Sequence, residues 1–414
     1  MKQCSRLIRP QISQRPRFPA LDPEPPPHPW RRVGTTLIVL LAVALGSWLG
    51  YNVSGTAPRP HHKDAVSVSF VRGLAGGVLA ETPGSLLSET DMHTGKGVVF
   101  KSFGQFSSNP DPAVSADGKY LLDVAVGRLL SISSLGHPQN VPNGLSFSPG
   151  DMPGFMPDPW SDHGLGVVEL SYPTGAGGLL STIPVAQFES VSTGRTVSLG
   201  LAESAAGDPR QAGAFIAVPR PGRPFPNGSQ PDTKLVLTDK GSRSRLLATA
   251  SQLSRAVGIK HGTAVTVTPI PNQQGSMVAV QVSAMSASGG GTVVSGGGIV
   301  VLRRNGRLLG SQPGAGGFLD WAGWSHSDKT LAFLGYGNGG PELTEWTVGT
   351  RSVTTALHDS TTQGPTACAW SPDDTSVICD GGPGGNWLLI RSGSKSVTAG
   401  QGQPLLWTSG RLGG

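Results

Sequence analysis

Hydrophobic positions follow two different patterns along the chain. Val33–Val53 is a continuous apolar run, VGTTLIVLLAVALGSWLGYNV, and no charged residue occurs between Arg32 and Arg59. After about residue 65 the apolar residues instead form short runs of Val, Leu, Ile, Ala and Phe, which Gly- and Pro-containing turns separate. The first pattern predicts one long helix, and the second is typical of many short β-strands.

The apolar run has the length of a membrane-spanning helix, because 21 residues at about 1.5 Å each extend about 30 Å. Trp48 and Tyr51 suit one membrane interface, and Arg31–Arg32 flank the other end. The basic excess before the run predicts a cytoplasmic N-terminus and an extracellular C-terminal domain at the cell membrane. A cleaved signal peptide is the alternative. We favour an uncleaved anchor, since the preceding region is long and the run exceeds a usual signal core.

Three further boundaries follow from composition. Residues 1–32 hold eight prolines and show no apolar periodicity, which predicts a disordered, basic cytoplasmic tail. Residues 54–65 form a linker. Residues 66–414 are expected to form one extracellular all-β domain.

A repeated turn motif runs through this domain. An apolar or aromatic residue, a polar turn and a short apolar strand recur, as in GWSHSDKTLAFL and AWSPDDTSVICD. The first residues of six such turns are Ser115, Ser161, Arg210, Asn272, Ser325 and Ser371, with spacings of 46, 49, 62, 53 and 46 residues. Seven Gly-containing turns alternate with them, at Gly95, Gly136, Gly194, Gly241, Gly306, Gly349 and Gly393. A four-stranded propeller blade has a similar period, about 40–50 residues.

The repeat predicts a seven-bladed β-propeller, and two degenerate copies near residues 208 and 271 leave six or eight blades open. Val66–Arg72 and Pro404–Thr408 are expected to share a blade and close the ring, so that no long edge stays unpaired. The equivalent residues Trp160, Trp324 and Trp370 are expected to pack between blades rather than to stack on a ligand.

The motifs WSPDD, WSHSD and SADGK, each followed by a short apolar strand and later by a Gly turn, resemble the repeats of TolB-like and tryptophan–aspartate-repeat propellers. The resemblance covers roughly residues 66–414 and implies the fold, because these motif residues are structural. It departs from the family in lacking the Trp-Asp dipeptide. The anchor and the richness in Gly, Ala and Pro also resemble an actinobacterial surface protein.

The net charge of +6 comes almost entirely from the tail. Residues 33–414 hold 25 basic and 24 acidic side chains, so the domain is nearly neutral as a whole. A nucleic-acid partner requires a clustered basic face, which this balance does not indicate. We therefore predict no nucleic-acid binding.

No nucleophile elbow, phosphate-binding loop, HExxH or paired CxxC motif is present. We therefore predict no catalytic residue, no metal site and no cofactor. The only close histidine pair, His61–His62, lies in the linker and is interpreted as solvated.

Two cysteines flank one repeat turn in ACAWSPDDTSVICDG. Counting outward from the turn centre places Cys368 opposite Cys379. Directly opposed residues of antiparallel strands lie about 4.5–5.5 Å apart at Cα, within disulfide reach. The pair is therefore a disulfide candidate, with two buried free thiols as the alternative. Cys4, in the tail, should stay reduced.

Two function classes remain. Gly-rich segments such as 286–298, 335–342 and 380–386 follow the third strand of their repeats, and loops gathered on one face would suit a binding module for a protein or cell-envelope ligand. The ligand-binding residues are not identified. The alternative is a metal- or quinone-dependent, lactonase-like enzyme, with carboxylates such as Asp320, Asp380 and Glu169 converging on a central channel. We favour binding.

Overall fold

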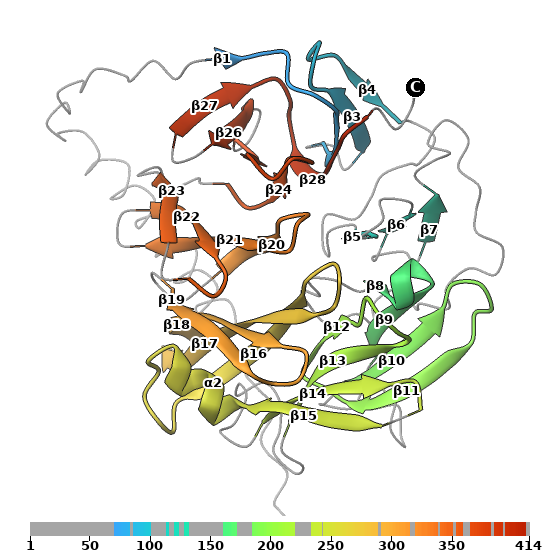
Figure 1. The fold of residues 1–414 in the computed structure, drawn as a ribbon, viewed down its shortest axis with the longest axis vertical. Coiled ribbons are helices and arrows are strands. Elements are labelled where there is room, and N and C mark those ends of the chain that lie inside the picture. Colours follow the sequence, from blue (N-terminus) through green and yellow to red (C-terminus); the bar gives the residue numbers. More distant parts are fainter. Residues whose placement is uncertain are drawn as a thin grey trace, which may run out of the picture. The chain divides into compact units, whose positions relative to one another are not determined.

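Short strands joined by tight turns dominate the computed structural model of the protein (Figure 1). The structure describes residues 70–82, 86–100, 113–115, 120–123, 128–131, 160–171, 184–219, 233–241, 243–288, 291–314, 319–337, 340–350, 353–358, 365–381, 385–391 and 394–410. In these ranges α2 (Ala250–Ala256) is the only α-helix, and no helix is long and apolar enough to cross a membrane. The predicted tail, anchor and linker lie outside the described residues.

The described strands form seven sheets, numbered here along the chain. Sheet 1 contains β28 (Gln403–Thr408), β2 (Gly77–Glu81), β3 (Leu87–Asp91) and β4 (Gly97–Val99). Sheet 2 contains β5 (Ala113–Val114), β6 (Tyr120–Asp123) and β7 (Arg128–Ser131). Sheet 3 contains β8 (Trp160–Ser161), β9 (Gly166–Ser171), β10 (Val185–Ser190) and β11 (Thr196–Leu201), with the 3-10 turn η4 (Asp162–Gly164) after β8.

The remaining four sheets repeat the same plan. Sheet 4 contains β12 (Ser204–Gly207), β13 (Gly213–Val218), β14 (Lys234–Asp239) and β15 (Ser244–Thr249). Sheet 5 contains β16 (Ala264–Pro271), β17 (Met277–Ser288), β18 (Gly291–Arg303) and β19 (Leu308–Pro313). Sheet 6 contains β20 (Leu319–Trp324), β21 (Thr330–Gly337), β22 (Gly340–Thr347) and β23 (Val353–His358). Sheet 7 contains β24 (Cys368–Trp370), β25 (Val377–Cys379), β26 (Trp387–Arg391) and β27 (Ser394–Thr398), with β1 (Phe70–Val71) on its edge.

Burial changes systematically across each sheet. The second strands are almost wholly buried: all five residues of β2 and the first five of both β9 and β13. The outer strands are much more exposed, and all three residues of β4 face solvent. A strand covered on both faces needs apolar residues at consecutive positions, which explains runs such as GAFIAV in β13. The sequence pattern thus reflects each strand's place in its sheet.

Seven apolar clusters fill the spaces between consecutive sheets. Phe188 on sheet 3 packs with Ile216 on sheet 4, and Ala279 on sheet 5 packs with Phe333 on sheet 6. Sheets 4 and 5, sheets 6 and 7, and sheets 1, 2 and 3 are joined in the same way. One cluster containing Trp387 and Trp407 joins sheet 7 back to sheet 1. The sheets therefore form a closed ring, and first strands of successive sheets such as β12 and β16 contact one another.

The two ends of the domain close the ring differently from the sequence-based expectation. The C-terminal β28 does join the N-terminal sheet, but its partner is β2, where Leu79 lies opposite Leu406. Phe70–Val71 instead pairs in parallel with β27 of sheet 7. The prediction that Val66–Arg72 shares a blade with Pro404–Thr408 was therefore wrong in its N-terminal partner. Both pairings protect the edge of a sheet from unwanted strand pairing. The C-terminal β28 covers the edge of sheet 1 at β2, and the N-terminal β1 covers the edge of sheet 7 at β27.

The repeat turns connect first to second strands, with one change of register. In each of five turns, the N–H of the first residue donates to the carbonyl five positions later. These first residues are Ser115, Asp208, Asn272, Ser325 and Ser371. Asp208, not Arg210, therefore begins the turn in sheet 4. The long gap that follows, from Asp208 to Asn272, accommodates α2.

The two other loop classes also have fixed places. Gly turns such as those of Gly306 and Gly349 connect third to fourth strands, and both glycines have positive φ, at 86° and 83°. The Gly-rich segments 286–298, 335–342 and 380–386 begin at the end of the second strand of sheets 5, 6 and 7, not after the third strand as predicted. Because successive strands alternate in direction, the repeat turns and the Gly turns share one side of the sheets, and the Gly-rich loops begin on the other. Much of those loops lies outside the described residues.

Candidate functional site

The repeated tryptophans link neighbouring sheets. Trp160, Trp324 and Trp370 are buried at the ends of β8, β20 and β24. Each indole N–H donates a hydrogen bond to the first strand of the preceding sheet. The acceptors are, in the same order, the carbonyl groups of Ala113, Ile270 and Gly323, at 3.4, 3.0 and 3.0 Å. The apolar ring fills the space between sheets while its N–H is satisfied, so this geometry is that of a packing residue.

The acidic residues of the repeat turns hold adjacent turns together. Asp328 of sheet 6 accepts hydrogen bonds from the backbone N–H groups of Gln273 and Gln274 in sheet 5, at 3.0 and 3.1 Å. Burial raises the pKa of Asp328, although these two N–H groups oppose the shift. A buried carboxylate engaged by backbone donors stabilises a junction between sheets, which is a structural role.

Between sheets 4 and 5, an ion pair with a buried carboxylate takes the place of this carboxylate–backbone contact. Asp208 is fully buried, and Arg304 donates to its two carboxylate oxygens at 2.7 and 2.5 Å. The same guanidinium donates to the carbonyl of Gly275 at 3.0 Å. Arg245 of β15 donates to the carbonyl of Arg304. These contacts draw the turns of sheets 4 and 5 into direct contact.

The three carboxylates named for the enzyme alternative lie in three different sheets. Glu169 is buried on β9, Asp320 belongs to β20, and Asp380 follows β25. The Asp380 carboxylate accepts hydrogen bonds from the N–H groups of Thr366 and Ala367, at 2.7 and 2.9 Å. Burial raises its pKa, against the effect of those donors. Within the described ranges, no three His, Cys, Asp or Glu residues gather as metal ligands would.

Cys368 and Cys379 are joined by a disulfide in the hairpin of β24 and β25. They lie directly opposite one another, as do Trp370 and Val377, and this is the register expected from the turn. Their Cα atoms are 4.1 Å apart, and both side chains are buried. The bond therefore crosslinks the two innermost strands of sheet 7. Cys4 lies outside the described residues.

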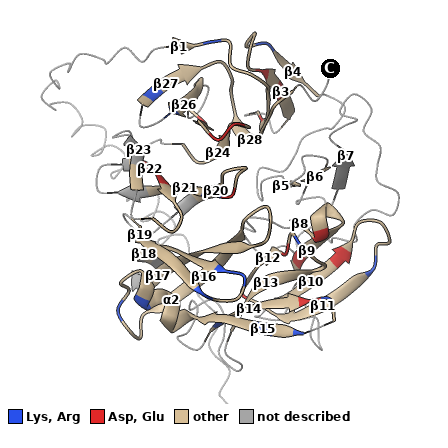
Figure 2. Ribbon diagram, in the orientation of Figure 1, with Lys and Arg blue, Asp and Glu red and all other residues tan. Residues whose placement is uncertain are grey.

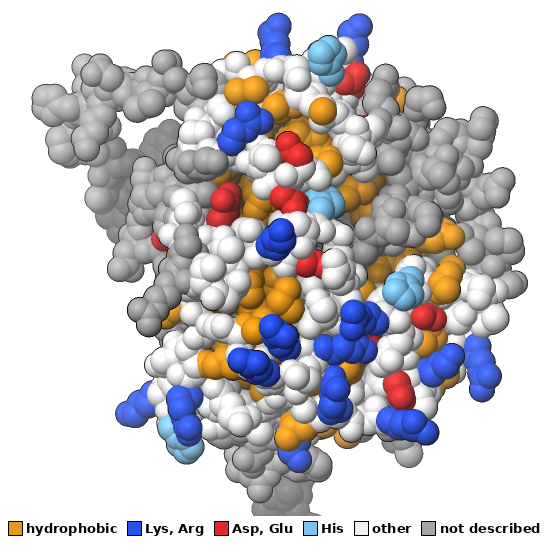
Figure 3. Space-filling model, viewed as in Figure 1, with side chains coloured by type: hydrophobic (Ala, Val, Ile, Leu, Met, Phe, Trp, Pro, Cys, Tyr) orange, Lys and Arg blue, Asp and Glu red, His pale blue; other side chains and the backbone are white. Residues whose placement is uncertain are grey.

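In one stretch of the domain, every Lys, Arg, Asp or Glu side chain is basic. Residues 240–319 contain eight Lys or Arg side chains and no Asp or Glu. The near neutrality of residues 33–414 therefore hides a strong separation: the other parts hold 17 basic groups against all 24 acidic ones. This stretch forms β15 to β19, in sheets 4 and 5. Lys and Arg outnumber Asp and Glu over these sheets in Figures 2 and 3.

Five exposed basic residues from this region and one adjoining turn define what we call the basic sector: Arg210, Lys240, Arg243, Arg303 and Arg307. All five lie in, or directly beside, repeat turns and Gly turns, which share one side of the sheets. Their turns touch, because the N–H of Lys240 donates to Ala212 at 2.8 Å and Arg245 reaches Arg304. None of the five has an ion-pair partner among the described residues.

The composition of the whole domain concealed the basic sector. A nearly balanced total predicts no charged face, and Arg210 and Arg303 are 93 positions apart in sequence. The usable signal is local: a run of 80 residues, 240–319, without a carboxylate. The grouping of these residues on one surface depends on folding, because only the packing of sheet 4 against sheet 5 brings their turns together.

No protein-family model and no curated protein sequence matches the chain. Solved structures do. The chain is similar to an oligogalacturonate lyase in complex with manganese, at 12% identity and a TM-score of 0.50, covering 75% of this chain and 82% of that one. It also matches TolB from Acinetobacter baumannii (13% identity, TM-score 0.37, 84% and 88% covered) and the Cps50 (Swd1) β-propeller domain from Myceliophteria thermophila (10% identity, TM-score 0.40, 79% and 85% covered). The fold is a β-propeller.

The closed ring of sheets, each built mainly of antiparallel neighbours, is the arrangement of a β-propeller and agrees with the fold that the WSPDD-type motifs indicated. At 10–13% identity the likeness concerns the fold alone. Unrelated binding proteins and enzymes share such folds, so activity has to be argued from this chain's own residues.

Proposed function

We propose that the protein is a membrane-anchored, extracellular binding module whose basic sector recognises an anionic partner in the cell envelope. In this proposal residues 33–53 span the bilayer, residues 1–32 are cytoplasmic, and the seven sheets are the seven blades of the propeller. The observation that carries the binding role is the separation of charge within the domain. The five exposed residues of the basic sector, which have no ion-pair partner among the described residues, create a positive surface field that attracts an anion.

The residue types favour an oxyanion-bearing polymer. Four of the five residues of the basic sector are Arg, whose planar guanidinium matches carboxylate, sulfate and phosphate groups with two parallel hydrogen bonds. The five residues come from turns of two adjacent sheets, so they present several separated cations rather than one pocket. A chain with repeated negative groups engages several of them at once and gains avidity.

The enzyme alternative also fits the fold, because one of the similar solved structures is a lyase. An experiment that measures both the retention of the protein on a polymer and the chain length of that polymer distinguishes binding from turnover. Polygalacturonate, a polymer of repeated carboxylates, serves as the anionic probe, and dextran serves as the neutral one. We expect retention of the protein on immobilised polygalacturonate, no retention on dextran, and an unchanged chain length of the polymer. Shortening of the polymer would support the enzyme alternative.

Two charge-reversal variants test whether the anionic partner binds at the basic sector. The variant Arg243→Glu/Arg303→Glu/Arg307→Glu changes the basic sector. The control Lys96→Glu/Arg195→Glu/Lys329→Glu makes the same charge change on exposed turns of sheets 1, 3 and 6. The basic tail is identical in both. We expect the first variant to lose at least about tenfold in affinity and most of the salt dependence, and the control to lose little. Equal losses would contradict a localised site.

A further inference from the structure

The longest spacing between repeat turns contains a structured insertion. Between Asp208 and Asn272, α2 and the loop 257–263 connect sheet 4 to sheet 5. The helix is held firmly despite its seven residues. Thr249 and Gln252 form a reciprocal capping box at its start, and Leu253 and Val257 are buried in the cluster between the two sheets. A short helix needs such tertiary support to persist, so the insertion is a fixed part of the surface.

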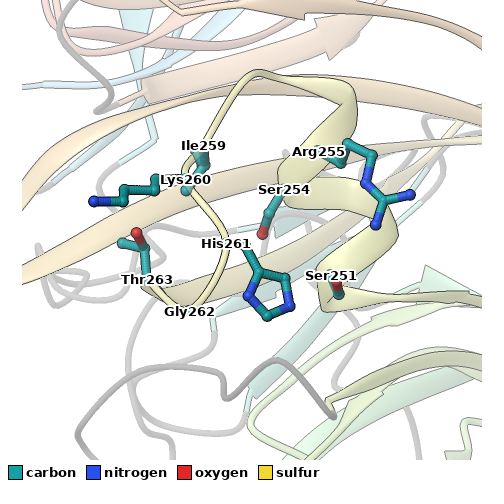
Figure 4. A pocket seen from close by; sticks show the side chains of 8 residues that line it. All are labelled: Ser251, Ser254, Arg255, Ile259, Lys260, His261, Gly262 and Thr263. Carbon is teal, nitrogen blue, oxygen red and sulfur yellow. The ribbon is translucent and has the colours of Figure 1, made fainter.

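A cavity of about 80 Å³ lies between α2 and the loop (Figure 4). Its walls include Ser251, Ser254, Arg255, Lys260, His261 and Thr263. In Figure 4, the Ser254 hydroxyl lies in the space between helix and loop, while the charged ends of Arg255 and Lys260 point away from this space on opposite sides. The volume is several times the ~10–15 Å³ that one water molecule needs.

The walls offer hydrogen-bond donors and positive charge, with no carboxylate. Three hydroxyl groups line the cavity, from Ser251, Ser254 and Thr263. Arg255 and Lys260 are exposed and have no ion-pair partner among the described residues. The cavity also belongs to the acid-free stretch 240–319. No neighbour in sequence therefore neutralises its positive charge.

The loop supplies further donors. Its ends are fixed, because the N–H of Ile259 donates to Ser254 at 2.9 Å and the N–H of Thr263 donates to Lys260 at 3.2 Å. Between them, the backbone N–H groups of residues 260–262 make no hydrogen bond in the described part of the chain. Successive unpaired N–H groups next to a left-handed residue form an anion-binding concavity, and Gly262 has φ 83°.

We propose that this pocket is a site for one tetrahedral oxyanion, a phosphoryl or sulfate group, held by the hydroxyl groups and the loop N–H groups and attracted by the flanking charges of Arg255 and Lys260. A tetrahedral group accepts hydrogen bonds in several directions, which matches donors placed around a cavity better than a planar carboxylate does. The site is separate from the basic sector and does not depend on it, since it lies at the end of β15 opposite the Gly turn. Free anion and a phosphoryl group on a larger envelope molecule share this chemistry.

Calorimetric titration of the full chain with inorganic phosphate, sulfate and glucose 6-phosphate tests the site, at constant ionic strength with chloride as the background anion. The variant Arg255→Ala/Lys260→Ala should weaken phosphate binding at least about tenfold, and Lys96→Ala/Arg195→Ala should leave it unchanged. All four residues are exposed, so neither variant threatens the core. Tighter binding of glucose 6-phosphate than of phosphate would support the site with a phosphorylated molecule as its ligand. Equal binding would support it with the free anion.

The proposal is overturned if phosphate and sulfate give no binding beyond chloride, or if both double variants bind like the unmodified protein. Ser254→Ala gives a second measure, because it removes one buried hydroxyl of the wall and keeps the charge. We expect a several-fold weaker affinity for phosphate in this variant. Retention on polygalacturonate should stay unchanged in the Arg255→Ala/Lys260→Ala variant, so failure of this site is distinguishable from failure of the basic sector.

Discussion

The carboxylate of Asp374 in sheet 7 accepts hydrogen bonds from the backbone N–H groups of His326 and Ser327 in sheet 6, at 2.6 and 2.7 Å. Asp328 makes the same pair of contacts one sheet earlier. Both Asp residues have positive φ, at 58° and 60°, a conformation that Asp tolerates better than most residues. The fourth position of the SPDD and SHSD turns therefore joins each sheet to the one before it.

Asp374→Ala should lower the free energy of unfolding by about 1–3 kcal/mol, because two backbone donors lose their charged acceptor. Asp373→Ala is the control for removing a carboxylate from the same turn, although Asp373 does not have the positive φ of Asp374. The Asp373 carboxylate is bonded within its own turn, to Ser371 and Thr375, so the expected loss is smaller. Urea unfolding of both variants gives the comparison. Equal losses would show that the contact between sheets contributes nothing extra.

The contribution of Asp374 should depend on pH. Burial raises the pKa of its carboxyl, but the hydrogen bonds from Ser327 and His326 outweigh burial, and the net pKa lies below 3.8. A lowered carboxyl pKa stabilises the folded state above the unfolded-state value and loses that effect as pH falls. The stability difference between the unmodified protein and Asp374→Ala should therefore be constant near neutral pH and shrink below about pH 4.

Glu203, directly before β12, should act in the opposite sense. Burial raises the pKa of its carboxyl from 4.5 to about 8, and its Oε1 atom has no hydrogen-bond partner. Between these two values the folded state keeps a proton that the unfolded state releases, so stability falls as pH rises. Glu203→Gln should be more stable than the unmodified protein at pH 7, by up to about 3 kcal/mol, and equally stable near pH 4.5. A constant difference across this range would contradict the prediction.

The disulfide predicts how many cysteine thiols can be alkylated before and after reduction. Without reduction, the full chain should expose one alkylatable thiol, Cys4, and two more after unfolding with reductant. Replacing Cys368 and Cys379 together by Ser should cost about 2–3 kcal/mol, because the bond closes a short loop. Alkylation of three thiols in the non-reduced, unfolded protein would exclude the bond.

The proposed topology is tested on intact cells. Protease added outside should degrade the chain after residue 60 and leave the tail, because the basic residues 1–32 favour the cytoplasmic side. An epitope placed at each end reports the two parts separately, and protoplasts replace cells if the wall blocks access. Protection of the C-terminal epitope in protoplasts would reject the extracellular assignment.

Local features were predictable because neighbours in sequence decide them. The register of Cys368 and Cys379 follows from a tight turn between them, and the structure has that register. The alternating turns indicated a β-propeller because each described sheet, apart from the closing strands β1 and β28, is built from consecutive strands. The repeat turn of sheet 4 shows where prediction from local sequence fails. Its first residue is Asp208 in place of a Ser, and only the backbone hydrogen bond from Asp208 to Gly213 identifies it.

By itself, then, the sequence determined the strand-and-turn repeat, the positions of the repeat turns apart from the one at Asp208, and the register of the two cysteines. Tertiary structure alone decided that β28 pairs with β2 and β1 with β27, since these partners are separated by more than 300 residues and no local pattern links them. It also decided the basic sector. Arg210, Arg243 and Arg307 become one surface only because the apolar faces of sheets 4 and 5 pack together and bring their turns into contact.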